Sequence, residues 1–188
     1  QWSTLHSEFA FLPRKFKIAV CGSNEDRAAF LLHDIGLQLV KNDNGELGFE
    51  VFVGGGLGRT PIIGSSIRKF LPKQHLLSYL DAILRVYNRY GNRDNKYKAR
   101  IKILVKAWTP EVFAKRVEEE WANIKDGPST LTDAELTRVT GFFSAPDYHD
   151  IDSTIADQSL AAQAAENNAF SRWLERNTEL QKQSGYRS

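Results

Sequence analysis

Hydrophobic and polar residues alternate over residues 16–20 and residues 48–53, and this pattern predicts β-strands that bury one face. In the first of them, the side chains at positions 16, 18 and 20 would face a core. A short apolar run at residues 37–40 predicts a third strand. The intervening turn residues, Asn-Asp-Asn-Gly at 42–45, would join it to the strand at 48–53 as a hairpin.

The spacing of apolar residues predicts helices in the first two thirds of the chain. Leucine and isoleucine recur every three or four positions from residue 74 to residue 90, and Gly91 is a typical stop signal. Pro110 is typical of a first helical turn, and Asn24 of an N-cap. The predicted helices cover residues 24–32, 74–90, 95–108 and 111–124. Strands and helices together indicate a domain that mixes α and β structure.

The pattern changes after Lys125. Residues 126–130 are Asp-Gly-Pro-Ser-Thr, which is a loop signal. Residues 140–157 are polar and are expected to form a linker or to wrap a surface, whereas residues 160–180 have apolar positions spaced for a helix.

Composition narrows the classes of protein that the chain can belong to. It has 188 residues, 41% of them apolar, and a net charge of +2, which fits one domain and argues against a general polyanion binder. No apolar run approaches the ~20 residues that span a bilayer, and no signal peptide opens the sequence. The single cysteine, Cys21, excludes an internal disulfide framework and an all-cysteine metal cluster, and favours a reducing, cytoplasmic compartment. Because methionine is absent even at position 1, we expect the sequence to be an internal piece of a longer protein.

Charge is unevenly distributed along the chain. Residues 1–125 hold 20 basic and 13 acidic side chains, whereas residues 126–188 hold 5 and 10. The basic surplus is concentrated between Arg85 and Lys106, a segment that we call the basic tract, where Asp94 is the only acidic residue.

The basic tract allows two interpretations. Arg85, Arg89 and Arg93 have helical spacing and would share one face, which is most often simply a solvated face. The functional alternative is a site for a polyanion. Tyrosines interleaved with the basic residues would suit single-stranded nucleic acid, and the arginines would equally suit a cofactor with many carboxylates.

A second candidate site is the segment before the first strand. Lys15 and Lys17 lie two residues apart, so on an extended chain they share a face at about 7 Å and could converge on a small anion. Arg14 adds a planar fork suited to a carboxylate or a phosphate. The alternative is an edge strand whose lysines are solvated and prevent aggregation.

A third candidate is the glycine run that follows the strand at 48–53. Gly54, Gly55, Gly56 and Gly58 would let the backbone approach a large ligand closely and would offer N–H groups to an anion. No Lys-Ser/Thr pair follows, so the run is not a P-loop. The alternative is a flexible surface loop. The four histidines have no metal-ligand spacing, and no metal ligand is predicted.

Four motifs together carry a resemblance to a known family. They are residues 11–17 (FLPRKFK), 33–36 (HDIG), 53–58 (VGGGLG) and 89–93 (RYGNR). In this order they closely resemble the assimilatory nitrite/sulfite reductase haemoproteins. The resemblance is dense from residue 9 to residue 121 and returns around residues 170–186.

The resemblance implies a fold, a reaction and cofactors. The fold would be α+β, with a mixed sheet of about five strands and packed helices. Family members carry sirohaem, a macrocycle with eight carboxylates, coupled through a cysteine thiolate to a [4Fe–4S] cluster. They reduce sulfite to sulfide, or nitrite to ammonia, by six electrons from a flavoprotein or a ferredoxin.

The resemblance also implies roles for individual residues. Lys15 and Lys17 would face the substrate as catalytic residues, and Arg14 would pair with sirohaem carboxylates. Gly54, Gly55 and Gly56, and less directly Arg93, would lie against the cofactor. Nitrite reductases of plants usually carry asparagine at the position of Lys17, so a lysine there favours sulfite.

The sequence also departs from the family pattern. Nothing matches the cluster-ligating cysteines, and the family's N-terminal ferredoxin-like half is missing, so the isolated chain is expected to be inactive and to lack the cluster. We expect a sirohaem- and substrate-side domain at 1–125, an acidic linker or wrap at 126–169, and the start of the following ferredoxin-like half at 170–188. The alternatives are a nitrite reductase of the same family and a non-redox basic module that binds RNA or an acidic partner.

Overall fold

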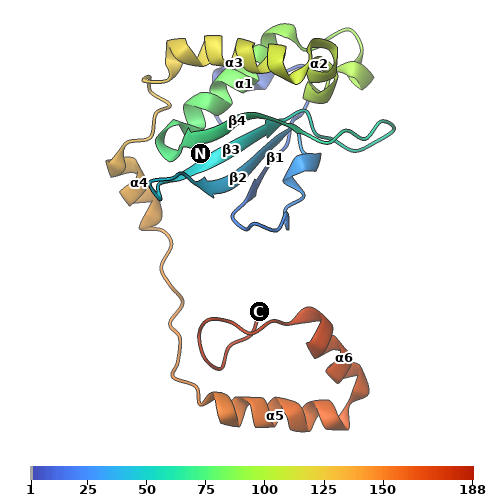
Figure 1. Ribbon diagram of the computed structural model, residues 1–188, viewed down its shortest axis with the longest axis vertical. Helices are drawn as coiled ribbons and strands as arrows, with labels where there is room; N and C mark the ends of the chain where they lie inside the picture. Colours follow the sequence, from blue (N-terminus) through green and yellow to red (C-terminus); the bar gives the residue numbers. More distant parts are fainter. Residues whose placement is uncertain (1) are drawn as a thin grey trace. The chain divides into compact units, whose positions relative to one another are not determined.

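A computed structural model describes residues 2–188 and confirms the α+β fold (Figure 1). By contacts the chain divides into a first unit that ends at Val139 and a second unit, Thr140–Ser188. The predicted functional divisions at 125 and 169 stay predictions.

The first unit is built on a mixed sheet that has four strands in the described part of the chain, where about five were expected. The strands are β1 (Ile18–Cys21), β2 (Ile35–Lys41), β3 (Leu47–Val53) and β4 (Ser65–Pro72), and they lie side by side in that order. β1 pairs with β2 in parallel, and the other two pairs are antiparallel.

Three α-helices cover one face of this sheet (Figure 1). The α-helices of the chain are α1 (Leu76–Tyr90), α2 (Ile101–Trp108), α3 (Pro110–Ile124), α4 (Asp133–Thr140), α5 (Ser153–Glu166) and α6 (Asn168–Asn177). Short 3₁₀ helices are η1 (Ser7–Phe11), η2 (Phe30–Leu32), η3 (Lys73–His75) and η4 (Lys96–Lys98).

The core lies between the sheet and the helices α1, α2 and α3. Ile35 on β2 pairs with Val53 on β3, and both are fully buried. They belong to the same cluster as Ile83 and Tyr87, which come from the apolar stripe of α1. Burying each such side chain stabilises the fold by about 1.5–3 kcal/mol, so the predicted periodicities directly build this core.

The opposite face of the sheet is partly covered by η2. The Phe30 ring lies 5.1 Å from the Phe52 ring, and a Cβ on Gly36 would come within 2.5 Å of the Phe30 carbonyl oxygen. Backbone of η2 therefore rests directly on β2.

The structure corrects the helix predicted for residues 24–32. Only Phe30–Leu32 is helical, as a single 3₁₀ turn, and Asn24 caps nothing. The side chain of Asp26 instead accepts the Phe30 N–H at 2.8 Å, and Ala29 adopts a left-handed φ of 49° that ends any continuous helix. Tight local hydrogen bonds of this kind compete with helix formation.

Other element boundaries also differ from the predictions. β4 has no counterpart among the predicted strands, because register irregularities against β3 interrupt its alternation. The segment predicted as one helix at 95–108 contains η4 and α2. The helix predicted at 160–180 begins earlier, at Ser153, and is divided at Asn167, whose side chain accepts the N–H groups of Ala169 and Phe170 and so caps α6.

A buried carboxyl group joins the start of the chain to α1. Asp81 accepts a hydrogen bond from the Ser129 hydroxyl at 2.5 Å, and its other oxygen lies 3.4 Å from Nε2 of His6. Burial raises the pKa of Asp81 above its ordinary value of 3.8, although Ser129 and His6 partly oppose this.

This environment predicts a pH dependence of stability. Because the folded-state pKa of Asp81 is raised, its contribution is complete below the unfolded pKa and is lost as the pH rises through the folded value. Asp81→Asn mimics the protonated carboxyl, so the difference in free energy of unfolding between the variant and the wild type should shift in favour of the variant as the pH rises above about 4. Urea denaturation at a series of pH values measures the difference; a difference that is constant with pH would contradict the prediction.

Candidate functional site

Three side chains hold the segment that carries the candidate lysines. Arg93 donates from Nη1 to the Phe11 carbonyl oxygen at 2.9 Å, and the Tyr87 hydroxyl donates to the Arg14 carbonyl oxygen at 3.1 Å. The Lys17 N–H donates to Oδ2 of Asp34 at 2.9 Å. We call residues 11–17 the lysine arm; its backbone is attached at three points to α1, to the loop after α1, and to the start of β2.

Lys15 and Lys17 lie before β1, not within it. The predicted strand at 16–20 begins only at Ile18, so both lysines are on the extended approach to the sheet, and both are exposed. Phe16 and Ile18 pack against the core as expected, whereas Val20 is 57% exposed because β1 is the edge strand. Within residues 2–188, no hydrogen bond or ion pair engages either ammonium group.

Arg14, unlike Lys15 and Lys17, has a partner for its side chain. Its Nη1 donates to the carbonyl oxygen of Lys96 in η4. The contact uses one of the five guanidinium N–H groups, so most of the predicted carboxylate-binding capacity of Arg14 remains.

The sequence interpretation gave no role in this site to Asp34, although the residue lies in the motif at 33–36. Its side chain is 0% exposed, and Arg100 grips both carboxylate oxygens, Nε to Oδ1 at 2.8 Å and Nη2 to Oδ2 at 2.6 Å. These hydrogen bonds raise the pKa of Arg100 above its ordinary value, although burial partly opposes this. The available signal was an aspartate at the start of an apolar strand, because a buried carboxylate requires a cationic partner.

The glycine run is buried against its own chain. Gly54 has a φ of +83°, and a Cβ on Gly55 would lie 2.2 Å from the Leu31 carbonyl oxygen and 2.5 Å from that of His33. A Cβ on Gly56 would lie 3.1 Å from Cδ of Lys102. Internal packing therefore already demands small residues here, and the predicted approach of Gly54, Gly55 and Gly56 to a cofactor stays a prediction.

The loop after the glycine run is held by a buried lysine. Nζ of Lys102 donates to the carbonyl oxygens of Leu57 at 3.0 Å and Thr60 at 2.7 Å. This lysine of the basic tract is thus committed to an internal contact.

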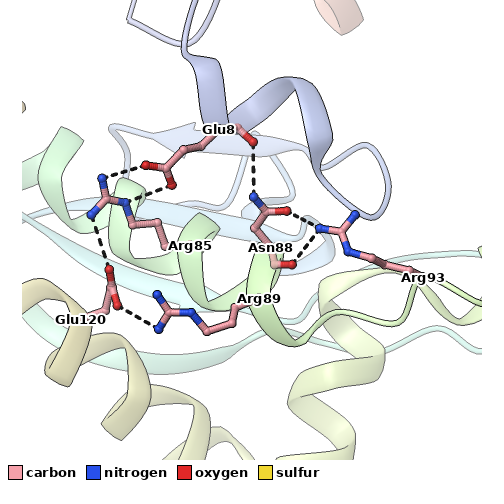
Figure 2. A pocket seen from close by; sticks show the side chains of 6 residues that line it. All are labelled: Glu8, Arg85, Asn88, Arg89, Arg93 and Glu120. Carbon is pink, nitrogen blue, oxygen red and sulfur yellow. Dashed lines mark hydrogen bonds and ion pairs between the residues drawn. The ribbon is translucent and has the colours of Figure 1, made fainter.

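Arginines of the basic tract line a cavity of about 450 Å³ between η1, α1 and α3 (Figure 2). Arg85 grips Glu8 through Nε at 3.1 Å and Nη2 at 2.9 Å, and also lies 3.4 Å from Glu120. Arg89 lies 3.3 Å from the other oxygen of Glu120. Two acidic side chains therefore neutralise much of the positive charge that the sequence places on this helix face.

Arg93 reaches the same cavity from outside the helix. α1 ends at Tyr90, so the predicted continuation of its arginine face to Arg93 is wrong. Arg93 instead donates to the backbone and side-chain oxygens of Asn88, at 2.8 Å and 2.5 Å (Figure 2). It also donates to the lysine arm.

The tyrosines of the basic tract are not equivalent. Tyr87 is fully buried, burial raises its pKa to about 12, and it cannot stack on a base. Tyr90 packs edge-on against Trp108 at 4.9 Å, and Tyr97 is 77% exposed. The aromatic platform expected for single-stranded nucleic acid is therefore reduced.

Two further features bear on the chemistry. Nowhere in residues 2–188 do three or more His, Cys, Asp or Glu residues gather as metal ligands would. Cys21 is a free, buried thiol that donates to the Glu25 carbonyl oxygen at 3.1 Å.

No helix within residues 2–188 is both long and apolar enough to cross a membrane.

Comparison with known proteins adds the functional context. Residues 1–125 match the family described as "Nitrite and sulphite reductase 4Fe-4S domain". The chain is 38% identical over 115 residues to a sulfite reductase [ferredoxin] of Synechococcus elongatus, covering 57% of this chain and 18% of that protein. It is 34% identical over 119 residues to an assimilatory ferredoxin-dependent nitrite reductase of Haloferax mediterranei, covering 61% and 20%.

A solved structure resembles the chain over the same region. The Mycobacterium tuberculosis NirA protein matches with a TM-score of 0.57 and 31% identity, over 65% of this chain and 22% of that one. The chain therefore spans about a fifth of the length of the relatives that it matches.

The packing of the glycine run predicts the effect of adding one methyl group. Gly55→Ala places a Cβ in collision with two backbone carbonyl groups, which cannot move like a side chain, so the free energy of unfolding should fall by about 1–3 kcal/mol or more. Gly22→Ala is the matched control, because a Cβ there meets nothing within 4 Å, and should change stability by less than about 0.5 kcal/mol. Urea denaturation compares them; equal stability of the two variants would show that Gly55 is not required by packing.

Proposed function

The chain belongs to the nitrite and sulphite reductase family, and from this premise we propose that it is the substrate-side domain of a sulfite reductase haemoprotein. In the intact protein, sulfite would be reduced to sulfide by six electrons at a centre that contains sirohaem and a [4Fe–4S] cluster. The observation that carries the proposal is the pair of exposed ammonium groups, Lys15 and Lys17, on an arm whose backbone is fixed at three points.

The role of the two lysines is electrostatic. Ammonium groups held by a rigid backbone attract a small oxyanion without reorganising, and they can donate protons or orient water as oxygen leaves. Because the lysine arm is tied to α1 and β2, the backbone positions of the two lysines are set before the anion arrives. Positioning of this kind lowers the cost of bringing the anion and the two lysines together from water.

The residues of the chain fit sirohaem but not the cluster. Arg14 and the exposed Lys96 of η4 provide cations suited to the carboxylates of sirohaem. When bound, sirohaem would supply the redox-active iron. A [4Fe–4S] cluster takes four cysteine thiolates, whereas this chain contains Cys21 alone. The cluster ligands and the electron donor site, for a ferredoxin or a flavoprotein, are therefore assigned to other domains of the same reductase.

Sulfite is proposed over nitrite because of Lys17. Relatives named for sulfite and for nitrite match with 38% and 34% identity, so overall similarity does not discriminate between the substrates. A second lysine beside Lys15 favours the anion of higher charge, which is sulfite. Nitrite reduction by the same family centre is the alternative.

This substrate choice predicts a selective effect of Lys17→Asn. The variant removes one positive charge beside the anion, so the Kd for sulfite should rise roughly threefold to tenfold, and the Kd for nitrite by about twofold or less. Titrations followed by the lysine side-chain NMR signals of the 188-residue chain measure both. Lys41→Asn makes the same charge change at an exposed position at the end of β2 and should leave both constants unchanged. Equal weakening for the two anions would reject the preference for sulfite.

The assignment of the cluster to other domains predicts the behaviour of the purified chain. After incubation with iron, sulfide and sirohaem, it is expected to show neither [4Fe–4S] absorption nor sulfite reduction. Absorption spectra and a sulfide assay provide the test. A sirohaem Soret band accompanied by sulfite reduction would overturn the proposal that this is one domain of a larger enzyme.

The runner-up is a basic module that binds RNA or an acidic partner. The exposed Tyr97, together with the exposed Lys96 and Lys98 in η4, is the observation that favours it. Filter binding of single-stranded RNA across a salt series separates the two functions. Sub-micromolar affinity with a steep salt dependence would favour the module over the reductase domain.

A further inference from the structure

The ion pair of Asp34 and Arg100 lies directly behind the lysine arm. The carboxylate is buried, both of its oxygens accept from Arg100, and Oδ2 also accepts the N–H of Lys17. Arg100 immediately precedes α2 and is itself only 21% exposed. A charged acceptor makes a stronger and more directional bond to an N–H than a neutral one, so the position of Lys17 depends on this carboxylate.

Lys17 is held at both of its backbone polar groups, the N–H and the carbonyl oxygen. Asp34 takes its N–H, and the N–H of Ile35 donates to its carbonyl oxygen at 3.1 Å. The same residue, Asp34, accepts the Gly54 N–H at its own carbonyl oxygen at 3.0 Å. One residue thus sets the distance between the lysine arm and the first glycine of the run.

The charge of Arg100 matters as much as its hydrogen bonds. An unpaired carboxylate behind Lys17 would repel an approaching anion and offset part of the attraction of the ammonium group. The low dielectric of the interior would screen this repulsion only weakly. Paired with Arg100, the carboxylate keeps its acceptor oxygens but presents no net charge. The attraction of Lys15 and Lys17 for an anion is then not reduced by the carboxylate.

We propose that Asp34 and Arg100 are a positioning pair which, through the Lys17 backbone, sets the position of Lys17 in the oxyanion site relative to the glycine run. The inference rests on the proposed function, because the oxyanion site is part of it. Neither residue touches the anion; both act through Lys17.

Charge-balanced double variants separate the acceptor from the ion pair. Asp34→Asn combined with Arg100→Gln removes both charges but keeps an oxygen for the Lys17 N–H. Asp34→Ala combined with Arg100→Met also removes both charges and leaves no acceptor. Neither leaves a lone buried charge, which would strongly destabilise a single variant.

Two NMR measurements on the 188-residue chain test the proposal. Hydrogen exchange of the Lys17 amide reports the bond to Asp34, and titration with sulfite, followed at the lysine side chains, reports the site. For the Asn/Gln variant we expect slow exchange at Lys17 and a Kd for sulfite within about twofold of the wild type. For the Ala/Met variant we expect exchange at least about tenfold faster at Lys17 and a Kd raised roughly threefold to tenfold.

A control variant accounts for a general loss of stability. Arg68 grips Glu118 with Nη1 at 2.7 Å from each carboxylate oxygen, on the far strand of the sheet. Arg68→Met with Glu118→Ala removes another two-point ion pair, whose carboxylate side chain is 40% exposed, and should leave Lys17 exchange and the Kd for sulfite unchanged.

Each outcome has one meaning. If the Ala/Met variant binds sulfite as tightly as the wild type while its Lys17 exchange is faster, or if the control weakens sulfite equally, the positioning role is rejected and the oxyanion site stands. If sulfite perturbs neither Lys15 nor Lys17 in the wild type, the proposed function fails, and the positioning role falls with it.

Discussion

The buried ion pair between Asp34 and Arg100 is the contact on which the geometry of this domain depends. Transferring a carboxylate out of water is costly unless a cation and hydrogen bonds replace the lost solvation, and here a two-point fork and a backbone N–H do so. The pair lies where four segments meet: the start of β2, the start of α2, the lysine arm and the glycine run. Apolar packing could have filled the same space, but it would not have fixed the direction of a peptide N–H.

The basic tract illustrates the difference between charge in a sequence and charge available to a ligand. Arg85 and Arg89 lie against Glu8 and Glu120, and Arg100 lies against Asp34. Lys102 is occupied by carbonyl oxygens of the loop after the glycine run. Partners distant in sequence thus neutralise much of a local surplus, so the cations of the tract that stay exposed and unpaired are fewer than the composition indicates, and they include Lys96 and Lys98 of η4.

Strong periodicity made much of the fold predictable from the sequence. The apolar stripe of α1, Pro110 at the start of α3, and the hairpin of β2 and β3 follow from local pattern and turn chemistry. The strand β4 did not, because a β-bulge is decided by the partner strand. The break at Asn167 rests on local bonds to Ala169 and Phe170, but the apolar spacing on both sides of it is that of one continuous helix. For the site, Lys15 and Lys17 could be singled out by spacing, whereas the bond from Asp34 to Arg100 joins residues 66 positions apart.

The collision that a side chain on Gly55 would make has a consequence for comparing this family across species. An invariant glycine after β3 is commonly taken as the mark of a ligand that must approach the backbone. Here the carbonyl groups of Leu31 and His33 already exclude any other residue, with or without a ligand. If this position is invariant, the invariance reflects how the segment at Leu31 and His33 rests on the end of β3. Evolutionary evidence for cofactor contact then has to come from positions where the chain itself leaves room for a larger residue.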